Sequence, residues 1–135
     1  MTWQQLQALQ ATGLFDIQSH TYWHPNFVRE KRRLNPDAYK RFVNMQLVKS
    51  RQTLEARTGG RVDMLAWPFG LHDSELEQSA VEAGYVAAFT MERRAARDTD
   101  NPMAIPRYLI TDEVRDRAFA AILRPTNPAP ISEHK

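Results

Sequence analysis

The chain has 135 residues, of which 42% are hydrophobic and 25% are charged, and this composition indicates one ordinary globular domain. Its 18 basic and 16 acidic residues leave a net charge of +2, so the overall charge favours neither nucleic-acid nor membrane binding. The absence of cysteine excludes disulfides and thiolate metal sites, which leaves histidine and the carboxylates as the strong metal ligands.

The first predicted element is a helix that begins after Thr2. Thr2 and Gln5 have the spacing of a capping box, apolar residues follow at helical intervals, and Gly13 is placed to end the helix in a left-handed turn. The next segment, "LFDIQS" (14–19), is short and rich in apolar residues. It predicts a buried strand whose C-terminal end delivers His20.

A long helix and a second strand are predicted next. The helix begins at Asn35-Pro36-Asp37, with proline in its first position, and runs to Gly59-Gly60. An apolar run from Val62 to Trp67 follows and is closed by Pro68 and Gly70, which indicates a strand leading into a tight turn.

The third predicted unit is again a helix followed by a strand. Ser74 and Glu77 form another capping-box pair, so a short helix is predicted to start there and to stop at Gly84. The segment "YVAAFT" (85–90) is the third predicted strand.

The last part of the chain contains a fourth predicted strand, "IPRYLIT" (105–111). Thr111 or Asp112 is expected to cap a final helix through Leu123. Residues 1–124 are therefore predicted to form the domain, and the proline-rich residues 125–135 a disordered tail.

Helices and strands thus alternate at short intervals, which is typical of βα units on a mainly parallel sheet, open or closed into a barrel. In such α/β folds, ligands gather where strands end and βα loops begin. The segments "SHTYWH" (19–24) and "WPFG" (67–70) both fall at that place.

The two histidines of the first segment are candidate metal ligands. His20 and His24 follow a predicted strand and precede Pro25, so a turn is expected in which both imidazoles can converge. Neutral imidazole is a common metal ligand, and two histidines with carboxylates and water would complete an open coordination sphere. The alternative interpretation is two unrelated loop histidines.

Three motifs in order resemble one known family. "SHTYWHP", with the form H-[ST]-x-x-H, is followed by "LAWPFG" and then by "AVEAGYVAAFT". Over roughly residues 1 to 112 the chain resembles the polysaccharide deacetylases, also called carbohydrate esterase family 4 or NodB-homology enzymes. With tryptophan at position 67, the "WPFG" turn is more similar to that of the members that deacetylate poly-N-acetylglucosamine than to that of other members.

The resemblance implies a NodB-type distorted (β/α) barrel and hydrolysis of acetamide C–N bonds on an acetylated glycan. It implies that His20 and His24 bind a divalent metal, commonly zinc. It also implies a sugar groove lined by Trp67, Pro68, Phe69 and Gly70. Core packing is the alternative for the two aromatic residues of this turn.

The chemistry of this family requires more than two histidines. A divalent cation polarises the acetamide carbonyl and lowers the pKa of a bound water, a carboxylate removes the proton, and a second group protonates the leaving amine. By resemblance, the third ligand and the base are the two aspartates of a "T-F-D-D" segment N-terminal to the histidines. The residues before His20 contain no such pair, so the catalytic base is not identified in this chain.

Chain length has a further consequence, because an ordinary single-chain barrel takes about 250 residues. At 135 residues the chain is expected to be the C-terminal part of a barrel that lacks its N-terminal strands. The exposed sheet edge would then favour a homo-oligomer, or pairing with a missing N-terminal segment or another chain.

Other polar residues near the motifs have two interpretations each. Asp16 is either a metal ligand or a structural hydrogen-bonding residue. His72 and Asp73 either approach the same cleft or form a solvated helix start. His134 in the tail is expected to be inert.

The strongest cluster of charge is a basic run in "REKRRLNPDAYKR" (29–41). It either meets phosphates or an anionic glycan, or forms a solvated loop and helix face, which the interrupting acidic residues favour. The run comprises Arg29, Lys31, Arg32, Arg33, Lys40 and Arg41.

Three functions therefore stand as hypotheses: a metal-dependent polysaccharide N-deacetylase in truncated form, a non-catalytic carbohydrate- or metal-binding remnant, and nucleic-acid binding. No membrane span is expected, because no apolar run approaches the roughly 18 residues required. Family members usually act outside the cytoplasm, yet the first ten residues do not form a signal peptide.

Overall fold

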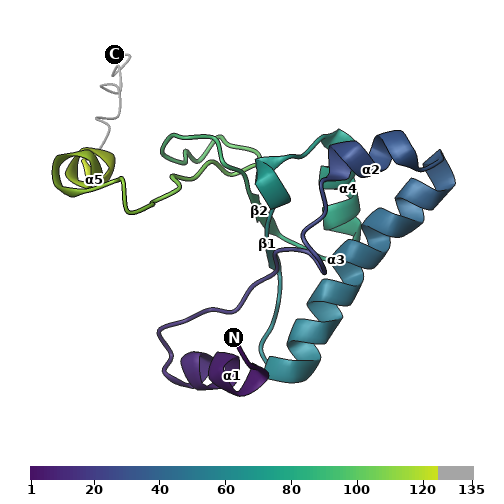
Figure 1. Cartoon of the computed structure of the whole chain (residues 1–135), viewed down its shortest axis with the longest axis horizontal. Coiled ribbons are helices and arrows are strands. Elements are labelled where there is room, and N and C mark those ends of the chain that lie inside the picture. Colours follow the sequence, from purple (N-terminus) through teal and green to yellow (C-terminus); the bar gives the residue numbers. More distant parts are fainter. Residues whose placement is uncertain (125–135) are drawn as a thin grey trace, which may run out of the picture.

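The computed structural model describes residues 1–124, in which α2, α3 and α4 lie on one side of a short parallel sheet (Figure 1). The predicted tail, 125–135, lies outside the described residues. None of the described helices is long and apolar enough to cross a membrane. In chain order the elements are α1 (Trp3–Ala11), α2 (Phe27–Arg33), α3 (Pro36–Thr58), β1 (Met64–Ala66), the 3₁₀ turn η1 (Pro68–Gly70), α4 (Ser74–Glu82), β2 (Ala87–Phe89) and α5 (Asp116–Leu123).

The sheet is built from parallel segments in chain order. β1 pairs with β2, and Leu65 lies opposite Ala88. Single parallel bridges extend the sheet on both sides, from Ser19 to Leu65 and from Phe89 to Ile105. The prediction of a mainly parallel sheet is therefore confirmed. Helices connect its first three segments, whereas residues 90–104 between β2 and Ile105 contain no helix.

The predicted strand at 14–19 is wrong, because only Ser19 pairs with β1. The side-chain oxygen of Gln18 accepts the backbone N–H groups of Asp63 (3.0 Å) and Met64 (2.9 Å), so an amide side chain replaces the backbone ladder there. The preceding apolar residues are also not buried, since Leu14 is 84% exposed.

The predicted strand at 105–111 is likewise reduced to a single bridge at Ile105. Pro106 has no N–H to donate to a ladder. The carbonyl oxygen of Thr90 instead accepts a hydrogen bond from the Nε of Arg107 at 2.8 Å. The side chain of Arg107 therefore takes the place that a backbone N–H would have in a continued parallel ladder.

The predicted first and long helices are confirmed with their caps. Thr2 and Gln5 form the expected capping box of α1, and Gly13 is left-handed. In α3, Asn35 accepts the N–H of Ala38 at 2.9 Å, and Gly59 ends the helix in a left-handed conformation.

Three helix starts differ from the prediction. Asp73, not Ser74, caps α4, because its carboxylate accepts the N–H of Leu76 at 2.9 Å. α5 begins at Asp116, after a turn in which the N–H of Val114 bonds the carbonyl of Thr111. α2 is an additional helix within the basic run, capped by Asn26.

The core lies between α3, α4 and the sheet, and α5 stands at the end of an extended segment away from it (Figure 1). Burial of these apolar side chains is the main force that holds α3, α4 and the sheet together. The core side chains are Phe27, Tyr39, Val43, Leu47, Val62, Leu65, Trp67, Leu76, Ala80, Tyr85, Ala88 and Met103.

Candidate metal centre

The turn that carries both histidines has an unusual backbone. Thr21 and His24 have φ angles of 66° and 59°, in the left-handed region that non-glycine residues seldom adopt. Such conformations persist where the surrounding structure over-determines them, and they cluster at functional sites.

Hydrogen bonds inside the turn stabilise this conformation. The N–H of Thr21 donates to the hydroxyl of Ser19 at 3.2 Å, and the N–H of His24 donates to the hydroxyl of Thr21 at 3.2 Å. The short polar side chains of "SHT" therefore replace the regular backbone bonds that a helix or strand would provide.

Two buried polar residues of α3 fasten the turn to the core. The side-chain oxygen of Gln46 accepts the N–H of Trp23 at 3.1 Å, and the hydroxyl groups of Ser50 and Ser19 lie 2.8 Å apart. Gln46 is fully buried. Because a buried amide must keep its partner, this contact fixes the position of the turn.

The two imidazoles converge, as predicted for this turn. The rings of His20 and His24 meet edge to face, with centroids 4.6 Å apart. Nδ1 of His20 lies 2.7 Å from the carbonyl oxygen of Ala66, and the His24 ring lies 4.6 Å from the ring of Phe69. The end of β1 and the turn after it therefore orient both histidines.

This arrangement suits metal binding at His20. A neutral imidazole that donates its Nδ1–H to a carbonyl keeps a free lone pair on Nε2, which is a common orientation of metal-binding histidines. Both histidines are exposed, so a cation can reach them.

The histidine pair supplies only part of a coordination sphere. Among residues 1–124, no group of three or more histidine and carboxylate side chains is placed to hold a metal ion. Both carboxylate oxygens of Asp16 accept from the side-chain amide of Gln18 at 3.0 Å. The described contacts of Asp16 are thus those of a structural hydrogen-bonding residue, although it lines the same hollow, of about 410 Å³, as His20.

The first two residues of "WPFG" agree with the core-packing alternative, and groove lining by this turn stays a prediction. Trp67 and Pro68 are fully buried, so their side chains belong to the core. The indole of Trp67 donates to the carbonyl of Met103 at 2.8 Å and packs edge-on against Phe27. Residues of a strand alternate between faces, and here the large ring takes the inward position.

The other half of this turn remains accessible. Phe69 is 54% exposed and has a left-handed φ of 57°, and Gly70 next to it has a φ of 67°. Phe69 contacts His24, so the aromatic residue that faces the histidines is the second one of the turn and not the tryptophan.

His72 and Asp73 form a helix start, as the second interpretation of this pair stated. Nδ1 of His72 lies 2.7 Å from the carboxylate of Glu77. Burial raises the pKa of Asp73, but hydrogen bonds from the ammonium of Lys31 and the N–H of Leu76 outweigh it, and the net pKa is lowered. The carboxylate of Asp73 is therefore engaged at the start of α4.

Side chains of the basic run form ion pairs with nearby carboxylates. Lys31 pairs with Asp73 at 2.9 Å and with Glu75 at 2.8 Å, and Arg33 pairs with Glu30 at 2.6 Å. These ion pairs agree with a solvated helix face.

Gln46 and Ser50 position the histidine turn, although no sequence motif marks them. Both lie on the buried face of α3, one helical turn apart, and they are the polar members of a face that is otherwise apolar. Polar side chains at buried helical positions need partners, and this pattern is the signal that identifies them.

Comparisons with known proteins agree with the geometry. The family model described as "Polysaccharide deacetylase" matches residues 1–88. The poly-beta-1,6-N-acetyl-D-glucosamine N-deacetylases of Staphylococcus aureus strains MRSA252 and N315 are each 26% identical over 109 residues. The match covers 81% of this chain and 38% of either relative, so the chain spans well under half the length of these proteins.

Solved deacetylase structures share the fold. The Streptococcus pyogenes deacetylase PplD, solved in complex with acetate, matches with a TM-score of 0.78 and 18% identity, over 93% of this chain and 51% of that chain. The de-N-acetylase from Aggregatibacter actinomycetemcomitans matches with a TM-score of 0.73 and 20% identity, over 91% and 53%.

Proposed function

Since the chain belongs to the polysaccharide deacetylase (NodB homology) family, we propose that it contributes the metal-binding histidines of an N-deacetylase that acts on an N-acetylglucosamine glycan. His20 and His24 are two protein ligands of a divalent cation, zinc by family resemblance. The observation that carries the proposal is the convergence of their rings at 4.6 Å, in a turn that α3 and β1 hold in place.

When bound, the metal supplies Lewis acidity toward the acetamide carbonyl and toward a water molecule. The described residues orient the site. Ala66 holds the His20 ring through its carbonyl oxygen, and Phe69 contacts the His24 ring and lies exposed beside it. We assign the side chain of Phe69 and the backbone of Gly70 to the edge of the sugar groove, and Trp67 and Pro68 to its support.

The carboxylates of the reaction are proposed to lie outside the described residues. Asp16 is bonded to Gln18, and residues 1–124 hold no third ligand placed with the histidines. The edge of the sheet at Ser19 is the place where another parallel segment with such carboxylates would pair.

We further propose that residues 1–124 form the C-terminal part of a (β/α) barrel. The four parallel segments that contain Ser19, β1, β2 and Ile105 lie side by side in chain order, as successive strands of a closed barrel do. The match to about half of each related structure supports this proposal.

A second candidate is a non-catalytic metal- or carbohydrate-binding domain. The specific observation in its favour is the lack, among the described residues, of a third metal ligand beside the histidine pair. Two imidazoles bind a divalent cation with modest affinity, while hydrolysis also requires a base.

Calorimetric titration of the 135-residue chain with Zn²⁺ and Co²⁺ tests the metal site. His20→Ala and His24→Ala are each expected to abolish the binding that His72→Ala retains, because His72 is engaged by Glu77. Equal binding by all variants would overturn the assignment of the ligands.

Acetate release from β-1,6-linked N-acetylglucosamine oligomers with added metal then separates the two candidates. Release that His20→Ala abolishes supports the enzyme. Metal binding without acetate release, both for the chain alone and after addition of a barrel segment that carries a carboxylate pair, supports the non-catalytic domain.

A further inference from the structure

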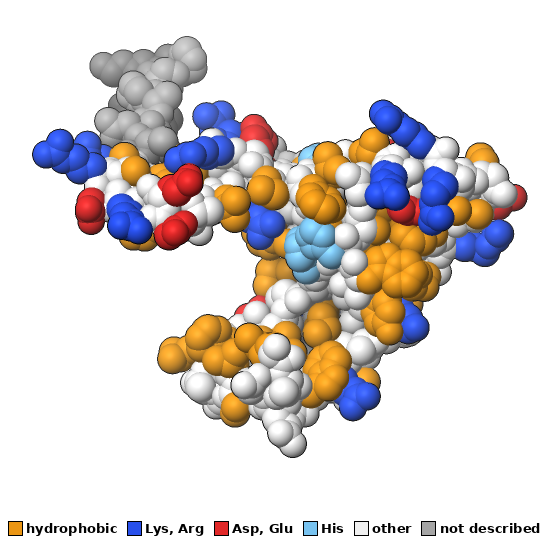
Figure 2. Space-filling model, in the orientation of Figure 1, with side chains coloured by type: hydrophobic (Ala, Val, Ile, Leu, Met, Phe, Trp, Pro, Cys, Tyr) orange, Lys and Arg blue, Asp and Glu red, His pale blue; other side chains and the backbone are white. Residues whose placement is uncertain are grey.

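The two aromatic residues between the histidines remain open to solvent. Tyr22 is 40% exposed and Trp23 is 60% exposed. Figure 2 shows hydrophobic side chains (orange) next to the pale blue histidine surface, toward α3. Large exposed aromatic groups beside a ligand site commonly mark a binding surface.

The exposed ring of Trp23 is held in place. Its backbone N–H donates to the buried side chain of Gln46, and its ring packs against Phe42 with centroids 5.9 Å apart. Phe42 packs in turn against Phe27 in the core. A ring fixed in this way loses little conformational entropy when a ligand stacks on it.

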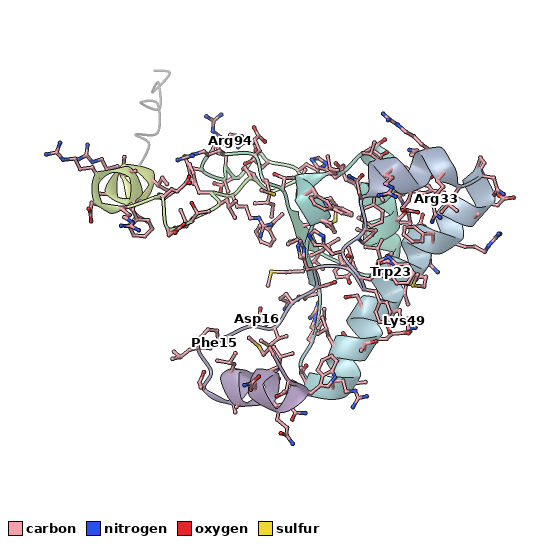
Figure 3. The ribbon with its side chains drawn as sticks, in the orientation of Figure 1. Phe15, Asp16, Trp23, Arg33, Lys49 and Arg94 are labelled. Carbon is pink, nitrogen blue, oxygen red and sulfur yellow. The ribbon has the colours of Figure 1, made fainter. Side chains whose placement is uncertain are left out.

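A cation lies beside the same surface. The ammonium of Lys49 lies 4.4 Å from the centroid of the Tyr22 ring, within the range of a cation–π contact. Figure 3 shows Lys49 on α3, on the same side of the molecule as Trp23. The surface therefore combines aromatic faces with a positively charged donor.

We propose that Tyr22, Trp23 and Lys49, here called the aromatic shelf, bind a neutral pyranose ring of the glycan next to the sugar that meets the histidines. This inference rests on the proposed function. The C–H face of a pyranose stacks on aromatic rings, and the ammonium of Lys49 donates hydrogen bonds to hydroxyl or acetamide oxygens.

Lys49 also makes the shelf selective. A deacetylated glucosamine carries an ammonium group, which the charge of Lys49 repels, whereas an N-acetylated ring is neutral. The shelf therefore favours stretches of the glycan that still carry acetyl groups. The sugar at the shelf influences which neighbouring residue is processed next.

Binding of a β-1,6-linked N-acetylglucosamine tetramer to the full chain tests the shelf without metal. In wild type, the tetramer is expected to shift the indole N–H resonance of Trp23 and not that of the buried Trp67. Trp23→Ala is expected to weaken binding about tenfold, which is the usual size of a central aromatic contact. Trp23→Phe should retain most of the affinity. Phe119→Ala, which removes a 42% exposed ring from α5, is the control away from the shelf.

The matching glucosamine tetramer tests selectivity. It is expected to bind more weakly than the acetylated tetramer, and Lys49→Met should narrow that difference. An unshifted Trp23 resonance, or equal affinity of wild type and Trp23→Ala, would overturn the proposal. A Trp23 shift that follows protein concentration and not sugar would overturn it in favour of a second copy on the shelf.

Metal titration of the same variants separates the two proposals. Trp23→Ala is expected to bind Zn²⁺ like wild type, because the shelf supplies no ligand. A wild-type chain that binds Zn²⁺ but not the tetramer contradicts the shelf alone. Tetramer binding at Trp23 without Zn²⁺ binding at His20 contradicts the metal site alone.

Discussion

Nδ1 of His20 lies 2.7 Å from the carbonyl oxygen of Ala66, the last residue of β1. The contact joins the histidine turn to the strand that leads into the Pro-aromatic-Gly turn. Since a carbonyl oxygen only accepts, Nδ1 must carry the proton, and Nε2 keeps the lone pair with which the proposed metal would bind.

Nitrogen NMR of the imidazole rings checks this assignment. Neutral His20 is expected to be the Nδ1–H tautomer, and added Zn²⁺ should shift its Nε2 resonance most strongly. His72, whose Nδ1 contacts a carboxylate, is the comparison ring and should stay unshifted. A His20 ring protonated on Nε2 would contradict the assignment.

Gln46→Leu is expected to destabilise the domain and to loosen the histidine turn. The substitution removes the acceptor of the Trp23 N–H, which costs about 1–3 kcal/mol for a buried unpaired donor. Urea unfolding followed by circular dichroism measures the loss, and Zn²⁺ affinity should fall with it. Gln52→Leu, at an exposed position of the same helix, is the control, and an equal loss in both variants would argue against a specific role for Gln46.

Gly70→Ala and Gly59→Ala separate backbone strain from a steric clash. Both glycines have φ near 70°, so either substitution places alanine in the left-handed region at a cost of about 1 kcal/mol. A Cβ at Gly70 would also lie 2.8 Å from the backbone nitrogen of Met91, whereas nothing lies within 4 Å at Gly59. The unfolding free energy should fall clearly more for Gly70→Ala, and equal losses would show that Met91 moves aside freely.

Asp100→Asn is expected to change how stability depends on pH. Two hydrogen bonds from Arg94, and one from the N–H of Arg97, lower the pKa of Asp100 from 3.8 to about 2. A carboxyl with a lowered folded pKa stabilises the fold above its unfolded pKa, and this contribution is lost as pH falls through the folded pKa. The urea midpoint of wild type should therefore exceed that of the variant by its full amount at pH 6. This difference should shrink between pH 4 and pH 2.

The control for this pH effect is Asp98→Asn in the same exposed loop, for which no ion pair is found within the described part of the chain. Its urea midpoint should track wild type at every pH. A gap for Asp100→Asn that stays constant down to pH 2 would mean that the carboxylate is not held by Arg94.

Leu14→Ser combined with Phe15→Ser is expected to reduce self-association. These side chains are 84% and 51% exposed on the segment before the sheet edge at Ser19, and Figure 3 shows Phe15 on the outer side of that segment. Exposed apolar side chains next to a sheet edge favour association with a second copy. Sedimentation velocity over a concentration series should show less oligomer for the double variant, while Val81→Ser on α4 should sediment like wild type.

Local signals in the sequence were sufficient for several elements. The ends of α1 and α3 depend on contacts between near neighbours in the chain, as in the capping box of Thr2 and the left-handed Gly59. The parallel strands around Leu65 and Ala88 depend on burial of apolar side chains. Helix caps and helical spacing arise from residues that are close together in the sequence, so they were predicted correctly.

Elements that depend on distant side chains were not predicted. The strand predicted at 14–19 does not form, because the side chain of Gln18 bonds to the backbone of residues 63 and 64. The strand predicted at 105–111 does not form, because the side chain of Arg107 bonds to the backbone of Thr90. A periodic pattern does not show which side chain will replace a backbone partner.

The sequence by itself determined that two histidines stand at the end of a parallel segment, ahead of an aromatic turn, in an order typical of polysaccharide deacetylases. Only the tertiary structure decided that Trp67 lies in the core and Phe69 beside His24, and that Gln46 holds Trp23 at the surface. The physical reason is that motif spacing follows the chain, whereas burial and hydrogen bonding depend on α3, which packs against the turn from more than twenty residues away.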